Sequence, residues 1–310
     1  MSHAKLAPHE LARLERARID EALYQLSRQY GRVILLVDRF GHKPMDDYLA
    51  EFEGPPPACL PLDDKMFAED LGRAPLLIEL LHTIPAHYTL LQHSIALAQE
   101  QSARTNGLYA VCGWLFGGAT LKRTRSELTK RLDARYPQHR VYLRYFDPRV
   151  MPRLATMLAP INENRNSPNS SFTDLLGPVD VWCHLDGHGR LVRHDKSEQR
   201  HKTCGGEMRF DEKLSQAIDR IEACNLTIDE LDSRPSLRNH RNDAAIDGYL
   251  LAAGQRGVHD QQDQVAYAWR AAAYGQAFIN HPQLQDFILS ALASGTPLEY
   301  FLRDRLPTFE

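Results

Sequence analysis

Hydrophobic residues near the start of the chain recur every three or four positions. Between residues 8 and 30 they are Leu11, Leu14, Ala17, Ile19, Ala22, Leu23, Leu26 and Tyr30. An α-helix brings such positions to one face, so the pattern predicts an amphipathic helix over 8–30, with Pro8 in its first turn. The next apolar run, at 33–37, is continuous, which is typical of a strand covered on both faces.

Short apolar runs and helical patterns then alternate up to about residue 193. We predict strands at 74–81, 108–115 and 140–146, a hairpin at 179–193 and helices at 86–101 and 120–135. The run at 74–81 also fits the start of a helix, but Pro75 and Pro85 bracket it and favour a strand. Helices that alternate with strands predict the α/β class, with a mixed sheet flanked by helices.

Beyond about residue 206 the strand pattern stops and helical periodicity continues. It predicts helices near 211–224, 243–254, 261–280, 283–293 and 298–305. We therefore predict two domains, an α/β domain over 1–205 and an all-helical C-terminal lobe over 206–310.

Charge and composition exclude several classes of protein. The 310 residues include 37 Lys and Arg against 40 Asp and Glu, a net charge of -3, so the whole chain has no field that would draw it to nucleic acid or anionic lipid. The N-terminus lacks a continuous apolar segment and no run of about 18 apolar residues follows, so we expect no membrane insertion and a cytoplasmic location. The five cysteines show no C-x-x-C spacing, which predicts reduced thiols and no cofactor held by cysteine pairs.

The most informative segment is the apolar and aromatic run that ends in Asp147-Pro148-Arg149. In an extended strand Arg144 would lie on one face with its aromatic neighbours, and Asp147 is its nearest candidate partner in the sequence. Asp147 also suits the cap of a helix that opens at Pro148, although Pro152 could delay the helix start. Two interpretations stay open: the cluster locks a strand to a helix, or Arg149 binds a partner. No Ser, Cys or His accompanies Asp147, which disfavours catalysis.

Potential metal ligands are densest in the region that follows. They are Cys183, His184, His188, His194, His201 and Cys204. Their spacing matches no zinc pattern, and adjacent residues of a strand point to opposite faces, so we expect solvated histidines and no metal.

The helix predicted from Thr120 is strongly basic. It carries Lys122, Arg123, Arg125, Lys130, Arg131 and Arg135. Such a run is usually a solvated helix face, and a docking surface for an acidic protein is the alternative. No aromatic interleaving accompanies it, so nucleic acid is disfavoured as a partner.

The longest C-terminal helix has an unusually small face, made mostly of alanines around Trp269. Small faces usually pack tightly inside a protein. The alternative is a groove that accepts an apolar helix of a client, with Trp269 as an anchor.

Several of these segments together resemble one protein family. In order, they are the strand ending in Asp38, the run at 74–80, the strand with Gly113-Trp114, the basic helix, Leu143-Arg144-Tyr145-Phe146-Asp147-Pro148-Arg149-Val150, and Leu176-Gly177-Pro178-Val179 before Trp182. This arrangement over about 31–185 resembles the type VI secretion effector-adaptor family, whose domain was long catalogued as one of unknown function.

The resemblance implies a bacterial chaperone that is not an enzyme. Such a protein holds a toxic effector, often through an apolar helical N-terminal segment of that effector, and hands it to the VgrG spike of a contractile injection apparatus. A hydrolase or metal-dependent phosphoesterase that uses Asp147, Asp180 and His184 is the rival hypothesis.

Overall fold

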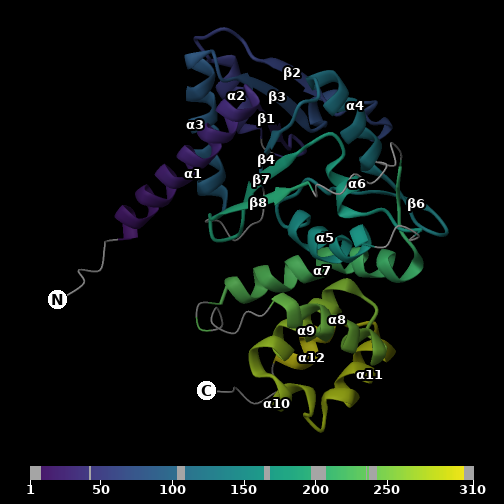
Figure 1. The fold of residues 1–310 in the computed structure, drawn as a ribbon. Coiled ribbons are helices and arrows are strands. Elements are labelled where there is room, and N and C mark those ends of the chain that lie inside the picture. The colour runs from purple at the N-terminus through teal and green to yellow at the C-terminus, as the bar shows by residue number, and fades with distance from the viewer. Residues whose placement is uncertain are drawn as a thin grey trace. The chain divides into compact units, whose positions relative to one another are not determined.

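The computed structural model describes residues 8–41, 43–102, 109–163, 168–196, 207–234, 236 and 243–303. The chain divides into two compact units, Met1–Leu214 and Ser215–Glu310. The first unit is built around sheets and the second is helical (Figure 1). The predicted α/β class with a helical C-terminal part is therefore confirmed.

A six-stranded sheet forms the centre of the first unit. Its strands lie in the order β2 (Ala58–Pro61), β3 (Leu76–Leu81), β1 (Arg32–Val37), β4 (Val111–Phe116), β7 (Val181–Leu185) and β8 (Leu191–Asp195). Each neighbouring pair is antiparallel. The labels in Figure 1 follow this order from β2 at the top to β8 at the bottom. The continuous apolar run at 33–37 thus became a central strand, where both faces are covered.

Two long helices cover one face of this sheet. They are α1 (Pro8–Tyr30) and α3 (Pro85–Ser102), both close to their predicted bounds. Ile19, Leu23 and Leu26 of α1 join the core cluster that also contains Leu35 and Trp114. The helical period of the sequence therefore marks the buried face of α1.

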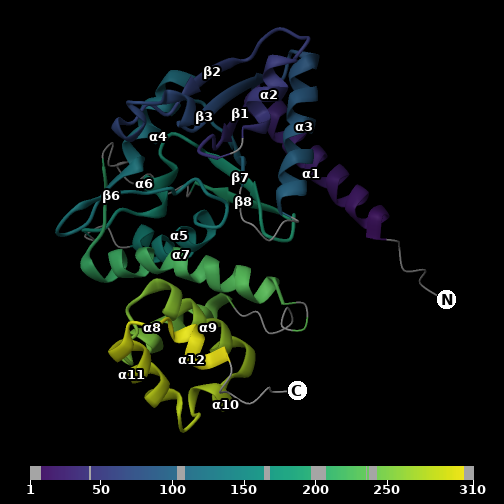
Figure 2. The same cartoon turned by 180° about the vertical axis from the view of Figure 1, so that it is seen from behind.

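Shorter elements complete the first unit. They are α2 (Pro44–Ala50), the 3-10 turns η1 (Lys65–Phe67) and η2 (Leu71–Arg73), α4 (Leu121–Leu132), α5 (Met151–Leu158), η3 (Ala159–Glu163) and α6 (Phe172–Leu176). Of these, α4 packs against β2 and β3. Seen from behind in Figure 2, α4, α5 and α6 lie on the opposite side of the sheet from α1 and α3.

The strand predicted over 140–146 is shorter than expected and lies outside the main sheet. Only β6 (Arg140–Tyr142) is extended, and it belongs to a separate three-stranded sheet with β5 (Asp133–Arg135) and β9 (Met208–Arg209). The chain leaves the extended conformation because a turn begins at Arg144, whose carbonyl accepts a hydrogen bond from the Asp147 N–H at 3.1 Å. Alternating apolar residues therefore gave a false strand signal beyond Tyr142.

The second unit consists of helices. They are α7 (Glu212–Asp232), which begins in the last residues of the first unit, α8 (Asp243–Gln255), α9 (Gln261–Tyr274), α10 (Gln276–Ile279), α11 (Leu284–Ser294) and α12 (Leu298–Arg303). The helix predicted over 261–280 is broken at Gly275, where φ is +57° and a side chain would be strained. Among the helices of the described ranges, none combines the length and the apolar character that crossing a bilayer requires.

Candidate functional site

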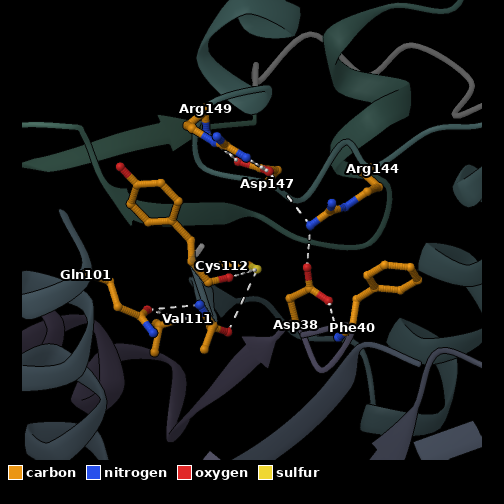
Figure 3. A network of polar contacts seen from close by, with 10 residues as sticks. Asp38, Phe40, Gln101, Val111, Cys112, Arg144, Asp147 and Arg149 are labelled. Atoms are coloured by element: carbon orange, nitrogen blue, oxygen red, sulfur yellow. Dashed lines mark hydrogen bonds and ion pairs between the residues drawn. The ribbon is translucent and has the colours of Figure 1, made fainter. Parts of the chain in front are cut away.

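An ion-pair cluster of Asp38, Arg144, Asp147 and Arg149 lies where two segments of the first unit meet (Figure 3). Asp38 follows β1 directly, and the other three residues belong to the turn between β6 and α5. The carboxylates are buried, with 8% of Asp38 and 5% of Asp147 exposed. The segment that the sequence singled out is therefore an internal junction of the fold.

Arg144 pairs more closely with Asp38 than with its predicted partner. Its Nη2 donates a hydrogen bond to Asp38 Oδ2, whereas Asp147 Oδ2 lies 3.8 Å from the same nitrogen. Asp147, the nearest candidate partner in the sequence, is thus the more distant of the two carboxylates, because a residue far away in the sequence comes closer. Burial lowers the pKa of the Arg144 guanidinium, but the charges of Asp38 and Asp147 outweigh this effect and the net pKa is raised.

Asp147 is held instead by Arg149. The Arg149 Nε and Nη2 lie 3.2 and 3.0 Å from the two carboxylate oxygens, and the Arg149 backbone N–H donates to Asp147 Oδ1 at 2.9 Å. The carbonyl of Asp147 accepts from the N–H groups of Val150 and Met151 at 2.8 and 2.9 Å, at the start of α5. Asp147 therefore terminates the turn and organises the helix start.

The two prolines of this segment fit that geometry. Pro148 lies inside the turn, and Pro152 occupies the first turn of α5, where a missing N–H costs nothing. The helix begins at Met151 and not at Pro148, so the delay that Pro152 suggested is what the structure shows.

Asp38 also joins the cluster to β4. Its N–H donates to the carbonyl of Ala110 at 2.8 Å, and its Oδ1 accepts from the Phe40 N–H at 2.9 Å. Gln101 of α3 accepts from the N–H groups of Ala110 and Val111 at 2.9 and 3.3 Å (Figure 3). The cluster thus connects the ends of β1, β4 and α3 to the turn before α5.

The thiol nearest the cluster is not activated. Cys112 is buried, and burial together with the charges of Asp38 and Asp147 raises its pKa well above the ordinary value. A thiol with a raised pKa stays protonated at neutral pH and is a poor nucleophile.

The aromatic residues beside the cluster are core residues. Tyr145, Phe146 and Trp182 are each at most 1% exposed, and the Tyr145 ring makes edge contacts with Phe146 at 5.8 Å and with Trp182 at 6.0 Å. The Tyr145 hydroxyl donates to the carbonyl of Leu128 in α4 at 3.0 Å. These side chains therefore attach the turn to both α4 and β7.

Gly177 and Pro178 form a second junction of the first unit. The Val179 N–H donates to the Leu176 carbonyl at 3.1 Å, and Gly177 has φ +58° and ψ -117°, the values of the first central residue of a type II′ turn. A Cβ at Gly177 would lie 2.6 Å from Cζ of Arg131. Glycine is required here by both the backbone and the neighbour.

Arg131 itself is a buried cation that the sequence interpretation missed. It is 1% exposed, its Nε donates to the Asp174 carbonyl at 2.6 Å, and its Nη1 lies 3.4 Å from Glu127 Oε2. The helical period contains the missing signal, because Arg131 lies three residues after Leu128 and seven after Thr124, on the buried face of α4. The basic helix is therefore not a uniformly solvated face.

Trp269 lies in the second unit, in the core cluster that α7, α8 and α9 share. It is 6% exposed and its ring contacts two guanidinium groups, with Arg234 Cζ at 4.2 Å and Arg270 Cζ at 4.1 Å from the ring centre. Arg270 pairs in bidentate fashion with Glu299 at 2.6 and 2.8 Å. Trp269 in this conformation is a packed residue.

The residues of the rival hydrolase hypothesis do not assemble into a metal site. Asp180, the residue before β7, and His184 within β7 are four positions apart, roughly 13 Å at 3.3 Å per residue. Within the described ranges, no three His, Cys, Asp or Glu side chains converge in a geometry that could hold a metal ion. His201 and Cys204 lie outside those ranges.

His184 is paired with His194 of β8 instead. Their Nε2 atoms are 3.1 Å apart, and His184 Nδ1 lies 3.1 Å from the Leu185 carbonyl, to which only a protonated nitrogen can donate. Only one of the two Nε2 atoms can carry the hydrogen of this bond, so at least one of the two rings is neutral. Burial lowers the pKa of both, and His184 lowers that of His194 further, to about 4.

Comparison with known proteins gives one family. Residues 34–165 match the profile of a family described as Domain of unknown function (DUF4123). This segment contains the whole ion-pair cluster, whereas Gly177, Pro178, Trp182 and the second unit lie beyond it. Neither the curated proteins nor the solved structures gave a match.

Proposed function

We propose that this protein is a non-catalytic adaptor of type VI secretion, which binds a toxic effector in the bacterial cytoplasm and loads it onto the VgrG spike. The proposal rests on the resemblance of the ordered motifs at 31–185 to the effector-adaptor family. The match of 34–165 to a family of unknown function agrees with it and adds no activity.

One observation supports the proposal above the others: the residues that carry the resemblance are joined to each other inside the fold. Both carboxylates of the cluster are neutralised by arginines, and Gly177 is fitted to Arg131. A general base needs a carboxylate within reach of a substrate, whereas Asp38 and Asp147 are buried and bonded to cations. The motif residues suit a rigid scaffold that presents surfaces to other proteins.

Such surfaces are present in both units. Large apolar side chains that are exposed include Leu14, Phe40, Met66, Leu71, Leu81, Leu226, Leu251, Leu289, Leu292 and Tyr300. Phe40 is 52% exposed beside Asp38, and the Arg73 guanidinium lies 4.3 Å from its ring centre. Aromatic, methionine and arginine side chains are the types enriched at protein interfaces.

Co-expression tests the proposal directly. The tagged full chain is produced with the effector encoded beside it, and separately with the VgrG protein of the same cluster of genes. We expect the effector to become soluble and to co-purify at a fixed stoichiometry, and the complex to be retained on VgrG. If the protein associates with neither the effector nor VgrG, the adaptor function is refuted.

A further inference from the structure

A groove lies beside the last strand of the main sheet. It has a volume of about 620 Å³ and is lined by Cys183 and Leu191 of the sheet and by Ala22 and Leu26 of α1. Leu26 and Cys183 belong to the core cluster of this sheet face, and Leu191 packs against it. The groove therefore opens from the apolar core to the surface at the sheet edge.

Along the same edge, the outer backbone groups of β8 pair with no other strand among the described residues. The Lys196 N–H donates to the Asp180 carbonyl, and the Asp186 N–H donates to the Arg190 carbonyl. Because hydrogen-bonded and non-hydrogen-bonded pairs alternate along an antiparallel ladder, these two bonds show which residues of β8 bond to β7. In this register the even-numbered residues of β8 bond to β7, and the N–H and C=O groups of Leu191, Arg193 and Asp195 point outward. Among the described residues no further strand pairs with them.

The two edges of the sheet differ. At the opposite edge β2 ends in Pro61 and follows a run of prolines at 55–57, and prolines block the addition of another strand. Neither β8 nor the turn before it contains a proline. An open edge beside an apolar groove is the arrangement in which an extended peptide gains backbone hydrogen bonds and side-chain pockets together.

The charges of the groove indicate what kind of peptide fits. Its lining contains Arg28 and Arg193 and no carboxylate. Arg193 already pairs with Asp195 at 2.6 Å, but none of the described residues forms an ion pair with the exposed Arg28. A strand with apolar side chains over Leu191 and a carboxylate near Arg28 would match both properties.

We infer that β8 accepts an extended strand of the effector, one that alternates apolar and acidic residues, and that the groove under α1 holds its inward side chains. The inference rests on the proposed adaptor function for the source of the strand. The strand adds to the sheet beside Leu191, Arg193 and Asp195, and the complex needs no covalent step.

A pair of substitutions at one position tests this assignment. Arg193→Pro removes an outward N–H while leaving the bonds to β7, and proline is tolerated at such edge positions; Arg193→Ala removes the same side chain and keeps the N–H. With the effector recovered by the wild type as the probe, we expect Arg193→Pro to weaken binding roughly tenfold or more relative to Arg193→Ala, because a backbone bond is lost and the ring obstructs the added strand.

Hydrogen exchange on the wild-type chain gives a second measurement that needs no variant. The amides of Leu191, Arg193 and Asp195 should exchange rapidly in the free protein and become protected in the complex. Equal binding by the proline and alanine variants, or unchanged exchange at these amides, overturns the inference while the adaptor function stands. Protection that appears in the free protein as its concentration rises would identify a second copy as the occupant and overturn it too. If the wild type recovers no effector, the inference is overturned, and if it binds no VgrG either, the adaptor function is refuted as well.

Discussion

The substitution Gly177→Ala tests how the Gly-Pro turn and the buried arginine depend on each other. Gly177 occupies the first central position of a type II′ turn, with φ +58° and ψ -117°. A Cβ at this position would lie 2.6 Å from Cζ and Nη2 and 2.9 Å from Nε of Arg131. Both the backbone and the guanidinium must therefore adjust to a single methyl group.

Two terms set the size of the effect. A non-glycine residue in this backbone region costs about 1–3 kcal/mol. Moving the Arg131 guanidinium away from the Asp174 carbonyl leaves buried donors unsatisfied, at about 1–3 kcal/mol. We expect the free energy of unfolding of the first unit to fall by about 2–6 kcal/mol, a large part of the stability of an ordinary domain.

Urea unfolding of the full chain, followed by the fluorescence of its tryptophans, measures this loss. Gly118→Ala is the matched control, because Gly118 has no atom within 4 Å of an added Cβ. The control should change the free energy of unfolding by less than about 1 kcal/mol. In an Arg131→Met background the guanidinium is gone, so the same Gly177→Ala change should cost only the backbone term.

The reasoning is refuted if Gly177→Ala and Gly118→Ala unfold at the same urea concentration. The part of the reasoning that concerns Arg131 is refuted if Gly177→Ala lowers the free energy of unfolding by the same amount with and without the arginine. The double-mutant cycle separates the two terms, since strain does not depend on residue 131 and the collision does.

Three further predictions concern buried charges. Asp38→Asn should lower the free energy of unfolding of the first unit by about 1–3 kcal/mol in urea, because Arg144 loses a buried counter-charge. The loss stays moderate because Arg144 itself is partly exposed to water. An unchanged urea midpoint would exclude an energetic role for the pair. The pKa of His194 is lowered to about 4 in the fold, against an ordinary 6.5, so its contribution to stability is complete above pH 6.5 and is lost as the pH falls toward 4. His194→Gln should therefore flatten the dependence of Tm on pH between these two values. An equally steep curve for the variant would contradict the lowered pKa of His194. Glu299→Gln should destabilise the second unit by about 1–3 kcal/mol, because it leaves the buried guanidinium of Arg270 without its counter-charge. Glu230→Gln is the control: it breaks an exposed pair with Arg234 and should cost less than about 1 kcal/mol. Similar losses for the two variants in thermal melts would argue against burial as the cause.

Elements with a strong period were predictable from the sequence. The helix at 8–30 and the strand at 33–37 are found close to their expected bounds, because each pattern reports a buried face directly. The strand at 140–146 was overextended, since apolar alternation persists into a turn that only the Asp147 hydrogen bonds define. Side-chain periodicity cannot show where a backbone changes direction.

Three of the four members of the ion-pair cluster were predictable, whereas Asp38 and its pairing with Arg144 were not. Arg144, Asp147 and Arg149 do form one cluster, but the closest partner of Arg144 is Asp38, 106 positions earlier. Local spacing carries no signal for such a contact. The burial of Arg131 could have been found from its helix face, because it lies in line with Leu128. Its proximity to Gly177 depends on the tertiary fold.

The separation of Asp38 from Arg144 has a consequence for the order in which the chain matures. Ribosomes add about 5–20 residues per second, so Asp38 leaves the ribosome several seconds before its counter-charge has been made. Until then the first strand, which lies at the middle of the sheet, lacks the cation at its end, although β3 and β4 have already been made. Closing so long a loop is slow relative to local pairing, so a nascent chain that stops before Arg144 should remain vulnerable to proteases, while one that extends past Asp195 and so includes β7 and β8 should resist them.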